Sequence, residues 1–294
     1  MRLDDYRTSS NVGDQRGQSF GGIGGGGGGI FGLLFGLVAS RFGIGGIIVL
    51  VIGAMLFGMN PFGGGGTGTQ RVASGGNNAA QACAVDQESR FSCQVLANTE
   101  DTWAGIFRER GQTYRPAQFN FYGGTGQSGC GIAQSAMGPF YCPTDNAIYL
   151  DTNFYDELRN RFGAAGDFAQ AYVIAHEVGH HIQYLTGTLG EASRAQQAVS
   201  PAEGNAIQVR VELQADCYAG VWAARNRARL EPGDVEEGMT AASAIGDDTL
   251  QKQSQGRVVP ESFTHGTSAQ RMEWLKKGLE SGDPAVCDTF QKAA

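Results

Sequence analysis

Two histidines four residues apart form the clearest chemical pattern in this chain of 294 residues. They are His176 and His180, and they lie in residues 171–184, which have the apolar spacing of a helix and contain no proline. Residues four apart share a helix face, so both imidazoles could bind one metal ion. Glu177 could hold a water molecule on that ion without being a ligand. His181 is turned off this face, so we do not expect it to be a ligand.

A metal held by two histidines needs another protein ligand, and a second helix predicted at residues 205–229 could provide it. Glu212 and Asp216 are again four residues apart, so they share a face of that helix. Glu212 is the candidate third ligand, and Asp216 could accept a hydrogen bond from the outer ring nitrogen of a ligand histidine. Simpler interpretations stay open: a surface patch for the histidines, an exposed helix position for Glu212, and a salt bridge from Asp216 to Arg210.

These two patterns together resemble the zinc site of the glutamate-zincin peptidases, which combines H-E-x-x-H with E-x-x-x-D. With a glycine-rich N-terminus, one apolar segment and the later residues 262–267, most of the chain resembles the bacterial, membrane-anchored, YpfJ-like family of neutral zinc metallopeptidases. The resemblance implies an α+β, predominantly helical domain of zincin type with a small sheet. It also implies a bound Zn²⁺ and a peptide or protein substrate.

The expected mechanism is hydrolysis of a peptide bond by a metal-activated water. His176, His180 and Glu212 would hold zinc, Glu177 would act as the general base, and Asp216 would orient His176.

His265 could stabilise the oxyanion that forms on the scissile carbonyl, because it precedes a helix predicted from the capping pattern of Thr267 and Gln270. A loop histidine without a catalytic part is the alternative for this residue. Two other functions also stay open for the whole chain: a catalytically silent, zinc-stabilised scaffold or binding factor for envelope proteins, and a hydrolase of another amide bond.

The N-terminal quarter of the chain is expected to lie outside the catalytic domain. Glycine is abundant there, with an unbroken run at residues 24–29, and residues 43–59 are apolar and uncharged. As a helix, this apolar run would be about 26 Å long, close to the thickness of a bilayer core. A buried core helix and a cleaved signal peptide are the alternatives for it. The predicted parts are a flexible tail at 1–41, a transmembrane helix at 42–60, a linker at 61–80 and the metallopeptidase domain at 81–294.

Charge and cysteine placement suggest a location. Arg41 precedes the apolar segment and little positive charge follows it before Arg71, which favours a cytoplasmic N-terminus. All six cysteines follow the segment, so we expect disulfides in an oxidising compartment. We therefore predict a single-pass protein of the bacterial inner membrane with a periplasmic domain. Of the fifteen possible pairings we choose Cys83 with Cys93, Cys130 with Cys142, and Cys217 with Cys287.

Composition argues against nucleic acid as a partner, because 29 acidic residues outnumber 22 basic ones. Residues 147–151 predict a strand, and we consider it as the sheet edge that pairs with an extended substrate, with an ordinary core strand as the alternative. Further helices are predicted at residues 84–111, 153–162, 167–186, 234–252 and 267–282.

Overall fold

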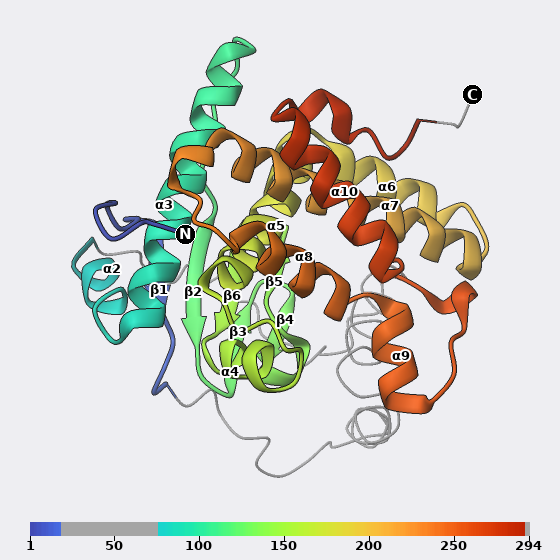
Figure 1. Cartoon of the computed structure of the whole chain (residues 1–294), viewed down its shortest axis with the longest axis horizontal. Helices are drawn as coiled ribbons and strands as arrows, with labels where there is room; N and C mark the ends of the chain where they lie inside the picture. Colours follow the sequence, from blue (N-terminus) through green and yellow to red (C-terminus); the bar gives the residue numbers. More distant parts are fainter. Residues whose placement is uncertain (19–75, 292–294) are drawn as a thin grey trace.

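Four strands from distant parts of the chain form the main sheet, in the order β1, β2, β6, β5 (Figure 1). The structure is a computed structural model, and it describes residues 1–18 and 76–291. The three strands β1, β2 and β6 run parallel, and β5 pairs antiparallel with β6. A hairpin of β3 and β4 makes a second, two-stranded sheet. The strands are β1 (Val12–Asp14), β2 (Gln118–Tyr122), β3 (Thr125–Ser128), β4 (Gly131–Gln134), β5 (Phe140–Cys142) and β6 (Ala147–Asp151).

The remaining elements are mainly helices, so the expected class, predominantly helical α+β with a small sheet, is confirmed for the described residues. Figure 1 shows α6, α7 and α10 grouped on one side of the molecule, and the sheet with α3 on the other. The helices are α2 (Gly76–Ala82), α3 (Gln87–Glu109), α4 (Asn153–Asn160), α5 (Asp167–Leu185), α6 (Thr188–Gln197), α7 (Pro201–Arg225), α8 (Asp234–Ala244), α9 (Asp247–Gln255) and α10 (Ser268–Ser281).

Helix α5, which carries the two histidines, is the most enclosed helix of the fold. Every residue from Phe168 to Gln183 is buried, so α5 is covered on all sides. Helices α3, α7 and α8 and strand β5 pack around it. Such a helix is held by packing on its whole circumference, which restricts how its side chains can move.

Glycine allows α5 and α7 to touch at backbone distance. A Cβ atom at Gly179 would lie 2.9 Å from the carbonyl oxygen and 3.0 Å from the Cα atom of Ala215. Helices α7 and α10 meet in the same way, because a Cβ at Gly220 or at Gly278 would overlap the backbone of the other helix. A larger residue at these points would push the helices apart.

The N-terminal segment does not behave as predicted. The expectation of a flexible tail at residues 1–41 is wrong for residues 1–18, because β1 pairs with β2 in the main sheet. The α-ammonium group of Met1 lies 2.6 Å from Asp167 and 3.0 Å from Asp234, the first residues of α5 and α8. Arg7 forms ion pairs with Glu100 and Asp101 on α3. The segment is therefore part of the same packed unit as residues 76–291.

This packing is incompatible with the predicted single-pass topology. A cytoplasmic N-terminus and a periplasmic domain would lie on opposite sides of the membrane, where Met1 could not reach Asp167. The predicted span at residues 42–60 lies outside the described residues, as does nearly all of the linker at 61–80. Within residues 1–18 and 76–291, no helix has the length and apolar character needed to cross a membrane.

All three predicted disulfides are confirmed. Cys83 is bonded to Cys93, Cys130 to Cys142, and Cys217 to Cys287. Disulfides are rare in reducing compartments, so they point to a location outside the cytoplasm.

Two other predictions need correction. Strand β6 at residues 147–151 is paired on both sides, with β2 and with β5, so it cannot be a free edge for substrate. The helix predicted at 234–252 is two helices, α8 and α9, separated at Ile245 and Gly246. Gly246 packs so closely against Ser268 at the start of α10 that a Cβ atom there would overlap it. The break lets the start of α9 face the loop before α10.

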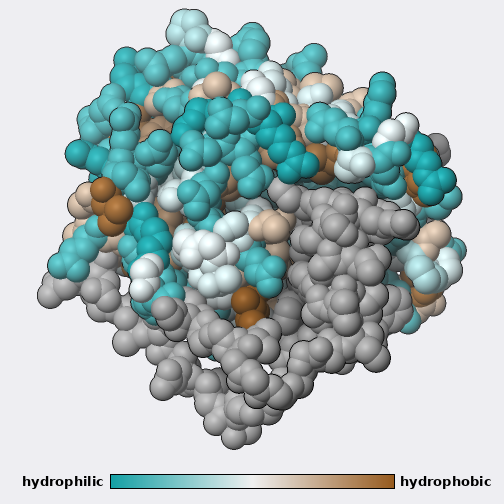
Figure 2. All heavy atoms as spheres, turned by 90° about the horizontal axis from the view of Figure 1, so that it is seen from below, coloured by the Kyte–Doolittle hydropathy of each residue, from teal (hydrophilic) through white to brown (hydrophobic). Residues whose placement is uncertain are grey.

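The described surface in one view is mainly hydrophilic, with separate hydrophobic residues (Figure 2). Exposed single hydrophobic residues are normal on soluble surfaces and need no partner to explain them.

Replacing Gly179 with alanine should therefore separate α5 from α7. We expect Gly179→Ala to lower the free energy of unfolding by about 1–3 kcal/mol, the usual effect of overpacking, as measured by denaturant titration. Gly105→Ala in α3 is the matched control, because no atom lies within 4 Å of its added Cβ. That control should be neutral or stabilising, since alanine favours a helix over glycine. Equal stability in both variants would contradict the close approach.

Candidate metal centre

Three side chains from two helices converge in the interior. His176 and His180 come from successive turns of α5, and Glu212 comes from α7. Oε2 of Glu212 lies 3.2 Å from Nε2 of His176 and 3.5 Å from Nε2 of His180. One ligand atom from each of the three lies within 4.8 Å of the others. All three residues are buried, with at most 9% of their surface exposed.

The spacing of these atoms fits a zinc ion. Zinc in proteins prefers tetrahedral nitrogen and oxygen ligands with bonds of about 2.0–2.1 Å, which places neighbouring ligand atoms about 3.3–3.4 Å apart. The two distances to Glu212 are close to that value. Three protein ligands would leave a fourth position for water or substrate, as in catalytic zinc sites.

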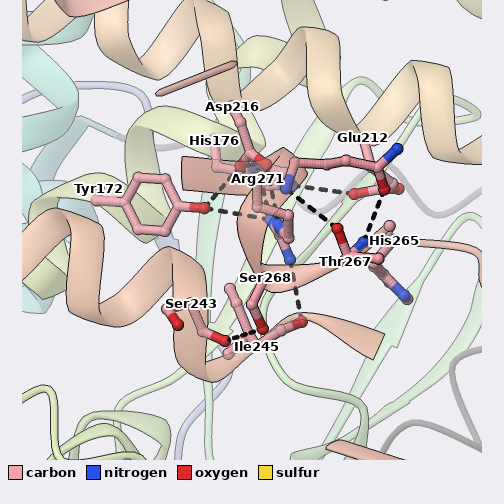
Figure 3. Close-up of polar contacts among 12 residues, drawn as sticks. Tyr172, His176, Glu212, Asp216, Ser243, Ile245, His265, Thr267, Ser268 and Arg271 are labelled. Atoms are coloured by element: carbon pink, nitrogen blue, oxygen red, sulfur yellow. Dashed lines mark hydrogen bonds and ion pairs between the residues drawn. The ribbon is translucent and has the colours of Figure 1, made fainter. Parts of the chain in front are cut away.

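The outer nitrogen of His176 is held by a buried carboxylate. Nδ1 of His176 donates to Oδ1 of Asp216 at 2.8 Å, which leaves Nε2, 3.2 Å from Oε2 of Glu212, as the nitrogen for a metal. Asp216 also accepts from the hydroxyl of Tyr172 at 2.6 Å and from two nitrogens of Arg271, each at 2.9 Å. Figure 3 shows these four side chains together. Asp216 accepts the expected hydrogen bond from His176, and its ion pair is with Arg271 rather than Arg210.

The other two candidate ligands also have fixed partners. Nδ1 of His180 donates to Oε1 of Gln183 at 2.9 Å, which again leaves Nε2 free for a metal. Gln208 donates to Oε1 of Glu212 at 2.9 Å, which leaves Oε2 facing the histidines. Each candidate ligand is thus oriented by one hydrogen bond on the side away from the others.

The charges in this site favour a cation between the histidines and Glu212. Burial would lower the pKa of His176, but Asp216 and Glu212 outweigh it and raise the pKa to about 10. Burial would raise the pKa of Glu212, yet the neighbouring His180 and His176 hold it well below its usual range. The pKa of Asp216 is about 2, because Arg271 and His176 outweigh the effect of burial. The site therefore stabilises positive charge where a metal would bind.

Glu177 lies beside the ligand set. Only 7% of it is exposed, and burial raises the pKa of its carboxyl above the usual value. It directly follows His176 in α5, and the charges of His180, His176 and Glu212 all affect its pKa. A carboxylate with a raised pKa next to a metal position can accept a proton near neutral pH.

His265 lies in the loop between α9 and α10. Oδ2 of Asp247 accepts from the backbone N–H groups of Thr264, His265 and Gly266, and its Oδ1 lies 3.3 Å from Nδ1 of His265. The neighbouring Gly266 packs against Val209 and Leu213, which lie on either side of Glu212 along α7. His265 and Glu212 affect each other's pKa, so the loop lies beside the ligand set.

His181 makes hydrogen bonds outside the candidate ligand set. Its Nε2 donates to the carbonyl oxygen of Arg115 at 2.6 Å, and its Nδ1 accepts from the hydroxyl of Tyr141 at 3.0 Å. Both ring nitrogens are occupied by groups outside the ligand set. The expectation that His181 is not a ligand agrees with this arrangement.

Sequence patterns did not reveal five residues that shape this site: Tyr172, Gln183, Gln208, Asp247 and Arg271. Gln183 and Gln208 had a usable signal, because each lies three or four residues from a candidate ligand on the same helix. Asp247 follows Gly246 in a pattern typical of a helix start, which also could have shown the break. Arg271 is 55 positions from Asp216, and no local pattern connects the two.

The sequence is similar to one family model and to several bacterial proteins. Residues 1–290 match a family model described as "Putative neutral zinc metallopeptidase". The uncharacterized protein YpfJ of Escherichia coli K12 is 47% identical over 306 aligned residues, which cover 100% of both chains. Uncharacterized proteins of Mycobacterium bovis and Mycobacterium tuberculosis H37Rv are 40% identical over 260 residues, which cover 82% of this chain and 86% of theirs. No solved structure matches the chain significantly.

Proposed function

Because the chain belongs to the neutral zinc metallopeptidase family, we propose that it is a zinc-dependent peptidase acting on peptide or protein substrates. The observation that carries the proposal is the buried set of His176, His180 and Glu212, in which Oε2 of Glu212 lies at the spacing of tetrahedral zinc ligands from Nε2 of both histidines. The outer hydrogen bonds support it, because Asp216 and Gln183 accept from the two histidines and Gln208 donates to Glu212, which fixes Nε2 of both rings and Oε2 of Glu212 toward one place.

Zinc bound there would activate a water molecule and polarise the carbonyl of the scissile bond. Glu177 accepts the proton of the attacking water and delivers it to the nitrogen of the leaving amine. Its raised pKa suits this exchange, because the group must both take and release a proton.

His265 is proposed to donate a hydrogen bond to the oxyanion that forms on the scissile carbonyl. Burial would lower the pKa of His265, but the hydrogen bond and negative charge of Asp247 outweigh it and raise the pKa above the usual value. Asp247 thus favours the protonated ring, which is the better donor. Asp247 acts through His265 and is a positioning residue.

The first test compares Glu177→Gln with the unmodified protein. We expect full zinc content in both, and cleavage of an unfolded protein mixture that is about 10²–10⁴-fold slower in the variant, because the proton acceptor is lost. Zinc would be measured by elemental analysis and cleavage by the release of amino groups. Glu191→Gln, at an exposed position of α6, is the control and should cleave normally. Zinc in both proteins with cleavage in neither would instead favour the scaffold function.

The second test concerns the pH dependence of turnover. Since the protonated form of His265 is the active one, kcat should be high below its raised pKa and fall as the pH rises through it. Asp247→Asn keeps acceptors for the backbone N–H groups but removes the negative charge, so the fall should move to lower pH. Asp283→Asn on the surface is the control. An unchanged alkaline limb in Asp247→Asn would remove His265 from the mechanism.

We also propose that the domain is attached to a membrane through the apolar residues 43–59, outside the cytoplasm. The packing of residues 1–18 onto residues 76–291 limits how this can happen. Both ends of the intervening stretch belong to one unit, so they must lie on the same side of the membrane. We therefore propose that the chain enters and leaves the membrane on the same side, instead of crossing it once.

Labelling of single introduced cysteines tests this topology in the full chain. Thr8→Cys and Lys252→Cys place thiols at exposed positions of the N-terminal segment and of α9. A membrane-impermeant maleimide added to intact cells, or to cells with a permeabilised outer membrane, should label both equally. Labelling of one position before lysis and of the other only afterwards would restore the single-pass topology.

A further inference from the structure

Gln183 is buried, and its side-chain amide makes three hydrogen bonds. Only one orientation of the amide satisfies all three. Its Oε1 accepts from Nδ1 of His180 at 2.9 Å. Its Nε2 donates to the carbonyl oxygen of Val211 at 2.7 Å and to Oε1 of Gln214 at 3.0 Å. Turning the amide over would place its nitrogen against His180 and its oxygen against two acceptors. The two acceptors on α7 therefore determine which atom of Gln183 meets His180.

Gln214 continues this series of hydrogen bonds away from the candidate metal site. It is also buried, and its Nε2 donates to the carbonyl oxygen of Cys287 at 2.9 Å. That bond leaves Oε1 of Gln214 to accept from Gln183. A continuous series of hydrogen bonds thus leads from the ring of His180 through two amides to one backbone carbonyl near the C-terminus.

The position of Cys287 depends on a disulfide. Cys287 lies in a short 3-10 turn at Pro284–Cys287, after the end of α10, and it is fully buried. Its sulfur is bonded to Cys217 of α7, which directly follows Asp216 and is 70 positions away. Two hydrogen bonds also tie this part of the chain to α7: the hydroxyl of Thr289 donates to the carbonyl oxygen of Arg210, and Nε of Arg225 donates to the carbonyl oxygen of Gly282.

We infer that Gln183 and Gln214 are positioning residues that connect the orientation of His180 to the Cys217–Cys287 disulfide, so that tight zinc binding depends on this disulfide. The inference rests on the proposed zinc site. A ligand histidine needs an acceptor at its outer nitrogen, and loss of such a partner typically weakens metal binding about 10–100-fold. Here the acceptor is itself held by a second amide, which is held by the disulfide-bonded Cys287.

The dissociation constant for zinc tests this directly, because it can be measured without any substrate. Full-length apoprotein would compete for zinc with a chromogenic chelator. We expect Gln183→Leu to bind zinc about 10–100-fold more weakly. Gln214→Leu and the double variant Cys217→Ala/Cys287→Ala should each bind about tenfold more weakly, at the lower end of that range. The control Cys83→Ala/Cys93→Ala removes the disulfide that joins the residue after α2 to α3, and it should leave zinc affinity unchanged.

Combining the changes separates positioning from general loss of stability. If the disulfide acts through Gln214, adding Gln214→Leu to Cys217→Ala/Cys287→Ala should weaken zinc binding no further. The visible absorption of the Co²⁺-loaded protein reports ligand geometry. It should change in the same way in Gln183→Leu, Gln214→Leu and Cys217→Ala/Cys287→Ala. Fully additive losses, or unchanged zinc affinity in Gln214→Leu, would overturn the inference. Failure of the unmodified protein to bind zinc would instead overturn the metal site itself.

Discussion

The close contact between α5 and α7 is the constraint on which the candidate site depends. Gly179 lies between His176 and His180, and the residue it touches, Ala215, lies between Glu212 and Asp216. The contact is therefore at the centre of the site, with two polar residues from each helix around it. Only at this separation can one carboxylate of α7 face both imidazoles while the next one reaches the outer nitrogen of His176. Gly220 and Gly278 bring α10 even closer to α7, which allows Arg271 to reach Asp216.

This geometry places several charges in the interior, and their balance explains the need for a cation. Asp216 and Arg271 neutralise each other through two hydrogen bonds, which makes their burial tolerable. Glu212 has no arginine or lysine partner among the described residues; Gln208 donates to its Oε1, and its Oε2 faces the two histidines. A buried carboxylate needs a compensating charge, which the histidines supply only when they are protonated, so a divalent ion would both complete the site and stabilise the fold.

The candidate ligands could be predicted from sequence because each pair lies within one helix, where spacing alone determines the face. The disulfides could be chosen for a similar reason in two cases, since Cys83 with Cys93 and Cys130 with Cys142 are close in sequence. Arg271 could not be connected to the site in this way, because it reaches Asp216 only through the packing of α10 on α7. Cys287 was paired with Cys217 from sequence, but the hydrogen bond that it accepts from Gln214 depends on tertiary structure. Strand β1 was missed for a related reason: three residues of a polar segment become a strand only because β2 is there to pair with them.

The N-terminal segment, residues 1–18, belongs to the same domain as the candidate metal site. Its first residue contacts the first residue of α5, and its strand extends the sheet whose other edge, β5, lies against the same helix. Arg16 continues the contact, since it donates to the carbonyl oxygen of Ala82 and to the hydroxyl of Ser89, beside the Cys83–Cys93 disulfide. Hydrogen bonds thus join the end of the N-terminal segment to the start of the second described range, close to the Cys83–Cys93 disulfide. Such an arrangement joins residues 1–18 to residues 76–291, so the packing of the helix that carries the histidines depends on both parts of the chain.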